Sequence, residues 1–213
     1  MIDKGRVTLM EGTRLRVGQA AAHEDVLVDG VPLDPPPGVV LMLNKPVGYV
    51  SSAKDPGAVV YDLLPPRFAL RTPVIAPAGR LDRDTTGLLL LTDDGQLNHR
   101  ITSPRRHVEK VYEAELAAPL RGHEEELFAS GTLTLKGDRD ALAPARLEPL
   151  TPTRVRMVIR EGRYHQVRRM FAAAGNHVVE LHRVSVGGLE LGDLPPGDWR
   201  VLSSPEVDSI LRS

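Results

Sequence analysis

Residues 79–92 read GRLDRDTTGLLLLT and place two acids, two arginines and two threonines directly before four consecutive leucines. The leucine run is short and ends at the turn-forming residues DDG at 93–95. We therefore predict that Leu88–Leu91 is a strand buried on both faces and not a helix. The polar residues then form the loop that leads into a core strand, and such loops commonly carry catalytic or binding residues. A solvated loop that only caps a turn is the alternative.

The length and composition limit the class of protein. A chain of 213 residues is long enough for one domain with a substantial core and a small additional unit. It has no cysteine, which excludes disulfides, thiol nucleophiles and cysteine-ligated zinc. No segment reaches the roughly 18 apolar residues of a membrane span, and the N-terminal MIDKGRVTLMEG lacks the apolar stretch of a signal peptide. We expect a cytoplasmic protein that does not contact a membrane.

Positive charge gathers in two stretches, although the formal net charge is only −1. Residues 79–112 contain five arginines and one lysine, and residues 160–183 contain five arginines against two glutamates. Acidic residues gather elsewhere, as in the EEE run at 124–126. Two basic stretches can together form an anion-binding face on a protein with no net positive charge. A purely solvated charged surface is the alternative.

The remaining pattern indicates an α+β fold. The run DPPPG at 34–38 is the best candidate for a linker, because proline-rich segments are stiff and do not continue helices or strands. We predict further strands at 39–43, 108–116, 154–159 and 178–186 and helices at 122–129, 164–174 and 205–211. Strands outnumber helices and do not alternate regularly with them, which favours a mixed, largely antiparallel sheet over a doubly wound parallel one.

The helix predicted at residues 164–174 has one apolar and one cationic face. Its apolar stripe recurs at i, i+3, i+4 and i+7 and consists of Val167, Met170, Phe171 and Ala174. Gly175 is placed to end the helix. On 100° steps, His165, Arg168 and Arg169 fall on the opposite side, so we expect three hydrogen-bond donors on one exposed face.

No sequence motif points to a cofactor or a metal. The chain lacks the phosphate-binding patterns GxxxxGK[ST] and GxGxxG. His177 and His182 are five residues apart in a predicted strand, which places their rings on opposite faces and argues against a metal site. Ser51 and Ser52 have no neighbouring base in the sequence to activate a hydroxyl nucleophile.

What remains is an acid pair, Asp82 and Asp84, beside arginines, with a distant cationic helix face and an aromatic Tyr112. A carboxylate that stays ionised in a dry pocket needs a cation or several donors, because desolvation raises its pKa. An arginine from elsewhere in the chain can supply that charge. Such an arrangement suits either a nucleophilic carboxylate or a structural ion pair.

Four blocks of the chain resemble those of the RsuA-type pseudouridine synthases, in the same order and with similar spacing. They are NKPVGYV at 44–50, GRLDRDTTGLLLLTDDG at 79–95, EKVYEAEL at 109–116 and EGRYHQVRRMFAAAGNHVVELHRVSVGGL at 161–189. The resemblance extends from about residue 39 to residue 202. The last block is more similar to the branch that modifies small-subunit ribosomal RNA than to the large-subunit branches. The resemblance implies the pseudouridine synthase fold for residues 37–213.

The resemblance also implies roles for particular residues. Asp82, and not Asp84, falls on the family's single catalytic aspartate. Tyr112 falls on the tyrosine that stacks on the target base and assists the proton step, and Arg168 on the arginine that pairs with the catalytic carboxylate. Residues expected to bind the substrate are Lys45, Arg80, Thr85, Arg105, Arg163, His165, Gln166, Arg169 and Leu181.

The implied reaction is the isomerisation of uridine to pseudouridine in small-subunit (16S) ribosomal RNA of a partly assembled subunit. It gains and loses no atoms overall and needs no electron acceptor, so we expect no cofactor and no metal. The aspartate could act as a nucleophile or as a base. The target base must leave its stack, and the two basic stretches would hold the flanking phosphates. A large-subunit substrate and a non-catalytic RNA-binding or ribosome-assembly protein are the alternatives.

Residues 1–36 resemble only part of the S4-type RNA-binding module that precedes the catalytic domain in this family. Residues 2–8 resemble the end of the module's second helix and its next strand, and residues 25–33 resemble its last strand. The two basic opening helices are not represented. We therefore expect a loosely ordered remnant and reduced RNA affinity, with a catalytic domain that still folds. A monomer is expected, because no exposed apolar stripe is evident.

Overall fold

The computed structural model describes the strand residues 2–3, 6–7, 27–28 and 31–32, and residues 34–212 apart from 53, 54 and 70. The chain divides into two compact units, residues 1–39 and residues 40–213. The functional residues predicted from the sequence all lie in the second unit.

The described strands of the first unit form one small sheet. β1 (Ile2–Asp3), β2 (Arg6–Val7), β3 (Leu27–Val28) and β4 (Val31–Pro32) follow one another in that order. β2 and β3 pair in parallel, and the other neighbours pair antiparallel. The rest of the segments predicted here lies outside the described residues, and the S4-like identity of residues 1–36 stays a prediction.

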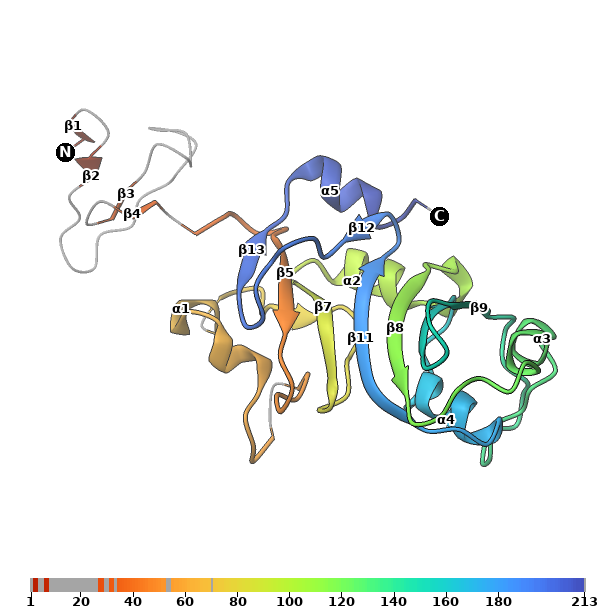
Figure 1. The fold of residues 1–213 in the computed structure, drawn as a ribbon. Coiled ribbons are helices and arrows are strands. Elements are labelled where there is room, and N and C mark those ends of the chain that lie inside the picture. The colour runs from red at the N-terminus through yellow and green to blue at the C-terminus, as the bar shows by residue number, and fades with distance from the viewer. Residues whose placement is uncertain are drawn as a thin grey trace. The chain divides into compact units, whose positions relative to one another are not determined.

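A nine-stranded sheet is the framework of the second unit (Figure 1). Seven of its strands follow in the order β13 (Trp199–Val201), β5 (Val40–Lys45), β7 (Thr85–Thr92), β11 (Val178–Val186), β8 (Lys110–Leu116), β10 (Arg154–Ile159) and β9 (Arg146–Pro149). β6 (Ala76–Pro77) pairs with β7, and β12 (Leu189–Glu190) pairs with β11. β7 and β11 run parallel, whereas the other neighbours run antiparallel. The predicted α+β fold with a mixed, largely antiparallel sheet is confirmed.

The leucine-rich strand lies in the middle of this sheet, as predicted. β7 has β5 on one edge and β11 on the other, and all four leucines at 88–91 are 0 % exposed. Leu88 and Leu90 belong to a core cluster with Leu97 and Ile101. Burying one leucine side chain contributes roughly 2 kcal/mol, so this run fixes β7 firmly. The polar loop before it is thereby anchored at one end to the most rigid part of the fold.

Gly87 allows β7 and β11 to approach each other closely. Its φ is +100°, and a Cβ added there would overlap the backbone of Arg183 on the neighbouring strand. Glycine alone combines a left-handed backbone with the missing Cβ that this approach requires. The parallel pairing of Leu181 with Thr85 and of Arg183 with Gly87 depends on it.

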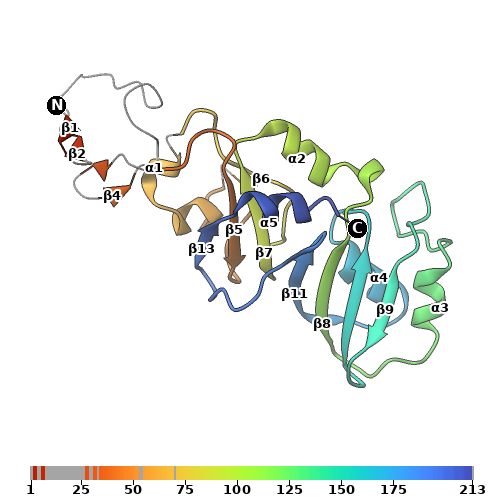
Figure 2. The ribbon, with the colours of Figure 1, turned by 90° about the horizontal axis from the view of Figure 1, so that it is seen from above.

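The helices surround the sheet. They are α1 (Pro66–Ala69), α2 (Gly95–Thr102), α3 (Glu124–Ala129), α4 (Gln166–Ala173) and α5 (Ser204–Ser209), with 3-10 turns η2 (Val60–Leu63) and η3 (Pro104–Arg106). Figure 2 shows α3 and α4 beside β9. The rings of Phe128 and Phe171 join these two helices edge to face, with centroids 5.2 Å apart. Among the described residues, no helix has the length and apolar character needed to cross a bilayer.

Three of these five α-helices were predicted, and α1 and α2 were not. α3, α4 and α5 lie within the predicted segments, except that α5 begins one residue earlier, at Ser204. The residues DDG at 93–95 are predicted only as a turn, but Asp94 is also the N-cap of α2. Its carboxylate accepts hydrogen bonds from the backbone N–H groups of Gln96 and Leu97 at 2.8 and 3.0 Å. An aspartate before a helix satisfies donors that would otherwise lack partners, so the same residues both turn the chain and begin a helix.

Candidate active site

A pocket of about 290 Å³ opens between the loop before β7, strands β8 and β11, and the start of α4. Most of the predicted site residues line it, namely Arg80, Asp82, Thr85, Tyr112, Arg163, His165, Gln166 and Leu181. They come from segments about 100 residues apart in the chain. The residues that line this pocket do not include Lys45, Arg105, Arg168 or Arg169.

Asp82 places a partly exposed carboxylate in this pocket. Its side chain is 31 % exposed, and the Nε2 atom of His165 lies 3.3 Å from its Oδ1 atom. The Asp82 carbonyl accepts a hydrogen bond from Thr85 N–H at 3.1 Å, which closes the turn into β7. A carboxylate in this setting is held in direction by the turn and is still open to a ligand.

His165 reaches Asp82 because its backbone is left-handed. Its φ is 48° and its ψ is 34°, and α4 begins only at the next residue. The predicted helix therefore starts two residues later than expected. Non-glycine residues rarely adopt this conformation, although histidine is enriched among those that do, and such residues cluster at active sites. The bend turns the imidazole away from the helix surface and toward the loop that carries the carboxylate.

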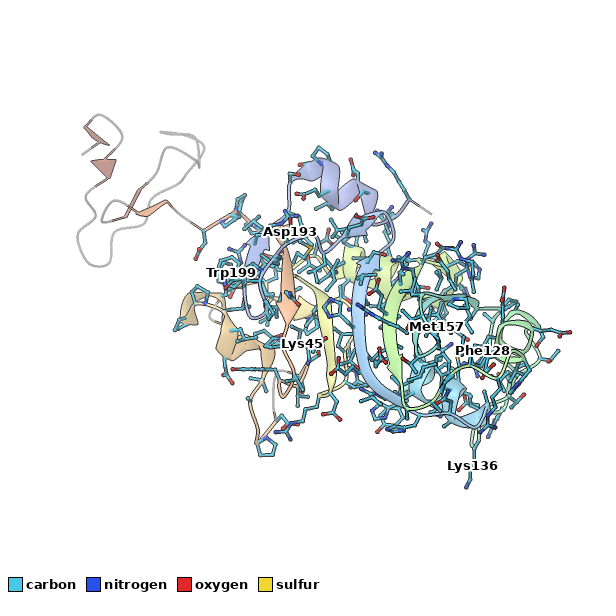
Figure 3. All side chains as sticks on the ribbon, viewed as in Figure 1. Lys45, Phe128, Lys136, Met157, Asp193 and Trp199 are labelled. Carbon is cyan, nitrogen blue, oxygen red and sulfur yellow. The ribbon has the colours of Figure 1, made fainter. Side chains whose placement is uncertain are left out.

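Lys45 stabilises the loop that carries Asp82 by hydrogen bonds to its backbone. The residue is 0 % exposed, and its ammonium donates to the carbonyl oxygens of Pro46, Arg83 and Thr85 at 2.9, 3.3 and 2.8 Å. Burial lowers the pKa of Lys45 to about 8, although the nearby Asp82 and Asp84 act to raise it. Figure 3 shows Lys45 on β5, within the sheet. The residue was predicted to bind substrate, but the structure gives it a supporting position behind the loop.

Tyr112 and Leu181 form the apolar wall of the pocket. They are 8 % and 5 % exposed and come from the neighbouring strands β8 and β11. The Tyr112 hydroxyl accepts a hydrogen bond from Arg183 Nη1 at 3.3 Å, and the Arg183 guanidinium carbon lies 5.9 Å from the centre of its ring. An aromatic ring beside an aliphatic side chain is a suitable surface for stacking a nucleobase.

Arg168 does not have the partner that the resemblance implied. Its guanidinium donates to the carbonyl oxygens of Val178 at 2.8 Å and Asp84 at 3.3 Å. The side chain that lies next to the Asp82 carboxylate is instead the imidazole of His165. Arg168 thus ties α4 to β11 and to the loop that carries the carboxylate, through backbone groups.

Arg163 and Arg169 were predicted to bind RNA, but both contact Asp138. Arg163 Nη1 and Arg169 Nη2 lie 3.0 and 2.6 Å from the two oxygens of this carboxylate. Hydrogen bonds from Arg169 and Arg163 lower the pKa of the Asp138 carboxyl. Gln166 joins the network, since its side chain accepts from Arg163 N–H at 2.9 Å and donates to Glu161 at 3.0 Å. The network fixes the segment before α4, including His165, against a distant turn.

Two of the predicted RNA-binding arginines stay exposed. Arg80 lies at the pocket rim, and Arg105 lies in η3, outside the pocket. Thr85 lines the pocket with a buried hydroxyl that has no hydrogen-bond partner among the described residues.

Lys110 and Arg183 also line the pocket but were not among the predicted site residues. Side chains two residues apart on a strand share one face. Lys110 therefore shares a face with Tyr112, as Arg183 does with Leu181. The two-residue alternation of side chains along a strand could therefore have identified both residues from the sequence.

Comparisons with known proteins identify relatives of this chain. Residues 39–173 match the sequence profile of the family described as RNA pseudouridylate synthase. The ribosomal small subunit pseudouridine synthase A of Escherichia coli K12 is 52% identical over 193 residues, which cover 89% of this chain and 81% of that protein. The protein of the same name from Yersinia pestis is 46% identical over 212 residues, which cover 96% of this chain and 87% of that protein.

Solved structures support the same relationship. A crystal structure of a pseudouridylate synthase matches with a TM-score of 0.77 and 46% identity, over 81% of this chain and 74% of that one. The structure of an H/ACA ribonucleoprotein bound to a substrate RNA containing 2′-deoxyuridine matches at 16% identity with a TM-score of 0.51, over 71% of this chain and 48% of that one, and shares the fold alone. Taken with the pocket around Asp82 and Tyr112, these matches show that the chain belongs to the RNA pseudouridylate synthase family.

Proposed function

We propose that the protein converts a specific uridine of small-subunit (16S) ribosomal RNA to pseudouridine, in the cytoplasm and without a cofactor. The observation that carries this proposal is the Asp82 carboxylate in a pocket walled by Tyr112 and Leu181. The names of the relatives from Escherichia coli and Yersinia pestis support the choice of small-subunit RNA.

The reaction is an isomerisation within one nucleotide. The N1–C1′ glycosidic bond breaks, the base turns, and a C5–C1′ bond forms. The proton on C5 leaves and N1 gains a proton, so atoms balance and no oxidant or reductant is required. A carboxylate can serve this chemistry as a covalent nucleophile or as a base toward the ribose. Asp82 is suited to either role, because it is partly exposed and its direction is fixed.

The target uridine has to leave its stack to reach Asp82, because a stacked, paired base conceals both faces. Tyr112 and Leu181 offer the replacement stacking surface. Arg80 and Arg105 are exposed and are suited to the flanking phosphates, so we expect affinity for RNA to fall as salt rises. The arginines bound to Asp138 contribute to the shape of the pocket more than to phosphate contacts.

The direct test is release of tritium from RNA labelled at uracil C5, with naked 16S RNA and with assembling small subunits as substrates. We expect wild-type protein to release tritium, Asp82→Asn to release none while still binding RNA, and the neighbouring Asp84→Asn to stay within about threefold of wild type. Activity in Asp82→Asn would remove Asp82 from the catalytic role. Tritium release from large-subunit RNA alone would change the substrate, and RNA binding without any release would favour a non-catalytic assembly protein.

A further inference from the structure

Two basic residues that line the pocket, Lys110 and Arg183, form no ion pair with any described residue. Arg183 is 4 % exposed. Its Nε donates to the Leu88 carbonyl at 2.7 Å and its Nη1 to Tyr112, but its Nη2 is buried with no hydrogen-bond partner among the described residues. Among the described residues, the Lys110 ammonium likewise has neither a hydrogen-bond acceptor nor a carboxylate partner. Burial, and then the charge of Arg183, lower the pKa of Lys110 to about 8.

Buried donors without acceptors are destabilising and are uncommon in folded proteins. When such donors line an open pocket, a ligand can supply the missing acceptors. Two positive groups side by side add mutual repulsion, which an anionic or strongly accepting ligand would relieve. The unpaired donors of these two lining residues are therefore suited to a ligand that presents oxygen acceptors to them.

Strand register shows where these donors lie relative to the rest of the site. Leu181 pairs with Thr85, which follows Asp82 by three residues. Two residues further along β11, Arg183 pairs with Tyr112. Three residues beyond that, Val186 pairs with Lys110. The pocket thus extends from the carboxylate, past the stacking wall, to the two cations. A base stacked on that wall would direct one edge at them.

We propose that Lys110 and Arg183 form a subsite for the carbonyl oxygens of the target uracil and stabilise the negative charge that the ring acquires during the reaction. This inference rests on the proposed function. It adds two residues that contact the substrate, and it gives a reason why the site accepts uracil. Cytosine carries an amino group in place of O4, so it would place a hydrogen-bond donor against the donors of Lys110 and Arg183.

The charge requirement holds for both roles open to Asp82. If the N1–C1′ bond breaks first, its electron pair stays on the base and spreads over N1, O2 and O4. If the carboxylate adds to C6, the electron pair of the ring double bond moves toward O4. In each case negative charge appears on a carbonyl oxygen of the uracil, and fixed positive groups beside that oxygen lower the barrier to the reaction. The ring loses this charge when C5 bonds to C1′. Removal of the C5 proton then returns a negative charge to the ring, and protonation of N1 neutralises it.

A phosphate is the weaker candidate for this subsite. Lys110 and Arg183 line the same pocket as the stacking wall and are partly buried and buried, respectively, whereas Arg80 is exposed. A flipped nucleotide keeps its phosphates in solvent and buries its base. The exposed Arg80 is therefore suited to a phosphate, and the less exposed Lys110 and Arg183 to the base.

The test compares single-turnover tritium release by the full chain carrying Lys110→Gln or Lys110→Arg. We expect Lys110→Gln to slow the step about 100-fold, with RNA affinity within about threefold of wild type, and Lys110→Arg to recover most of the rate because the charge is kept. Lys136→Gln is the matched control, because it removes the same charge at an exposed site, visible at the edge of the unit in Figure 3. We expect it to match wild type.

A second measurement does not depend on how well each variant folds. RNA carrying 2-thiouridine or 4-thiouridine at the target presents a weaker acceptor at O2 or at O4. We expect at least one of these substitutions to slow wild type several-fold more than it slows Lys110→Gln, as for two groups in contact. Equal thio effects in both proteins would overturn the subsite.

The remaining outcomes separate this inference from the proposed function. If Lys110→Gln keeps the wild-type rate but binds RNA more weakly, with a salt slope reduced by about one, Lys110 holds a phosphate and the inference is wrong. If wild-type protein releases no tritium from any ribosomal RNA, the proposed function fails and the inference fails with it. Wild-type activity combined with an unaffected Lys110→Gln overturns only the inference.

Discussion

The imidazole of His165 and the carboxylate of Asp82 meet across the mouth of the pocket, with Nε2 and Oδ1 3.3 Å apart. The two residues are 83 positions apart in the sequence. The contact depends on the left-handed backbone of His165 and on the arginine network that fixes the segment before α4. Among the described side chains, His165 is the direct polar contact of the proposed catalytic carboxylate, and the contact can be tested by substitution.

His165→Asn and His165→Ala should both lower the single-turnover rate roughly tenfold, because Asp82 loses a group that fixes its direction. Asparagine tolerates the left-handed backbone better than alanine does. We therefore expect the asparagine variant to keep wild-type thermal stability and the alanine variant to lose some. Wild-type rates in both variants would show that the contact is incidental.

Lys45→Met should destabilise the fold by about 2–4 kcal/mol, because three carbonyl oxygens lose their donor in a buried site. The loop that carries Asp82 would then be released, and activity should fall with stability. Urea denaturation measures the free energy of unfolding. Lys136→Met removes an exposed lysine, and we expect it to change that free energy by less than about 0.5 kcal/mol.

Gly87→Ala should lower the free energy of unfolding by about 3 kcal/mol or more. The new Cβ would overlap the backbone of Arg183, and the alanine would have to adopt an unfavourable positive φ. The parallel pairing of β7 and β11 would open and separate Asp82 from Tyr112. Gly95→Ala is the control, because a Cβ at Gly95 meets nothing within 4 Å. An unchanged unfolding midpoint for Gly87→Ala would contradict the close approach of the two strands.

Stability should rise with pH above about 8. Burial lowers the pKa of Lys45 and of Lys110 to about 8 in the folded protein, against the ordinary value of 10.5. Between these values the unfolded chain holds more protons than the folded chain, so the free energy of unfolding increases with pH. We expect a higher urea midpoint at pH 9.5 than at pH 7.5, and a smaller rise in Lys110→Gln. A urea midpoint that does not change between pH 7.5 and pH 9.5 would show that neither lysine has a lowered pKa in the folded protein.

Arg169 and Arg80 should differ in their effect on RNA binding. Arg169→Gln breaks the ion pair with Asp138, so we expect reduced stability and a nearly unchanged salt dependence of RNA affinity. Arg80→Gln removes an exposed charge at the rim, and we expect the slope of log affinity against log salt to fall by about one. The opposite result would restore Arg169 to the phosphate-binding role predicted from the sequence.

The sequence by itself determined the elements with strong local signals. The leucine run, the alternating strand at 154–159 and the apolar stripe before Gly175 depend on periodicity within a few residues, and all three occur as predicted. The motif blocks also sufficed to identify the family, because ordered blocks of ten or more residues rarely match by chance. The roles that these blocks imply for Asp82 and Tyr112 stay predictions.

Only the tertiary structure decided which charged groups meet. Arg168 donates to backbone carbonyls, Arg163 and Arg169 pair with Asp138, and Lys45 lies beneath the loop instead of at the RNA surface. The partner of a long charged side chain is set by strand register and loop path over dozens of residues, and a change of one residue in register turns a side chain to the other face. Periodicity can place a cation on a face, but it carries no information about the carboxylate or carbonyl that the fold brings to it.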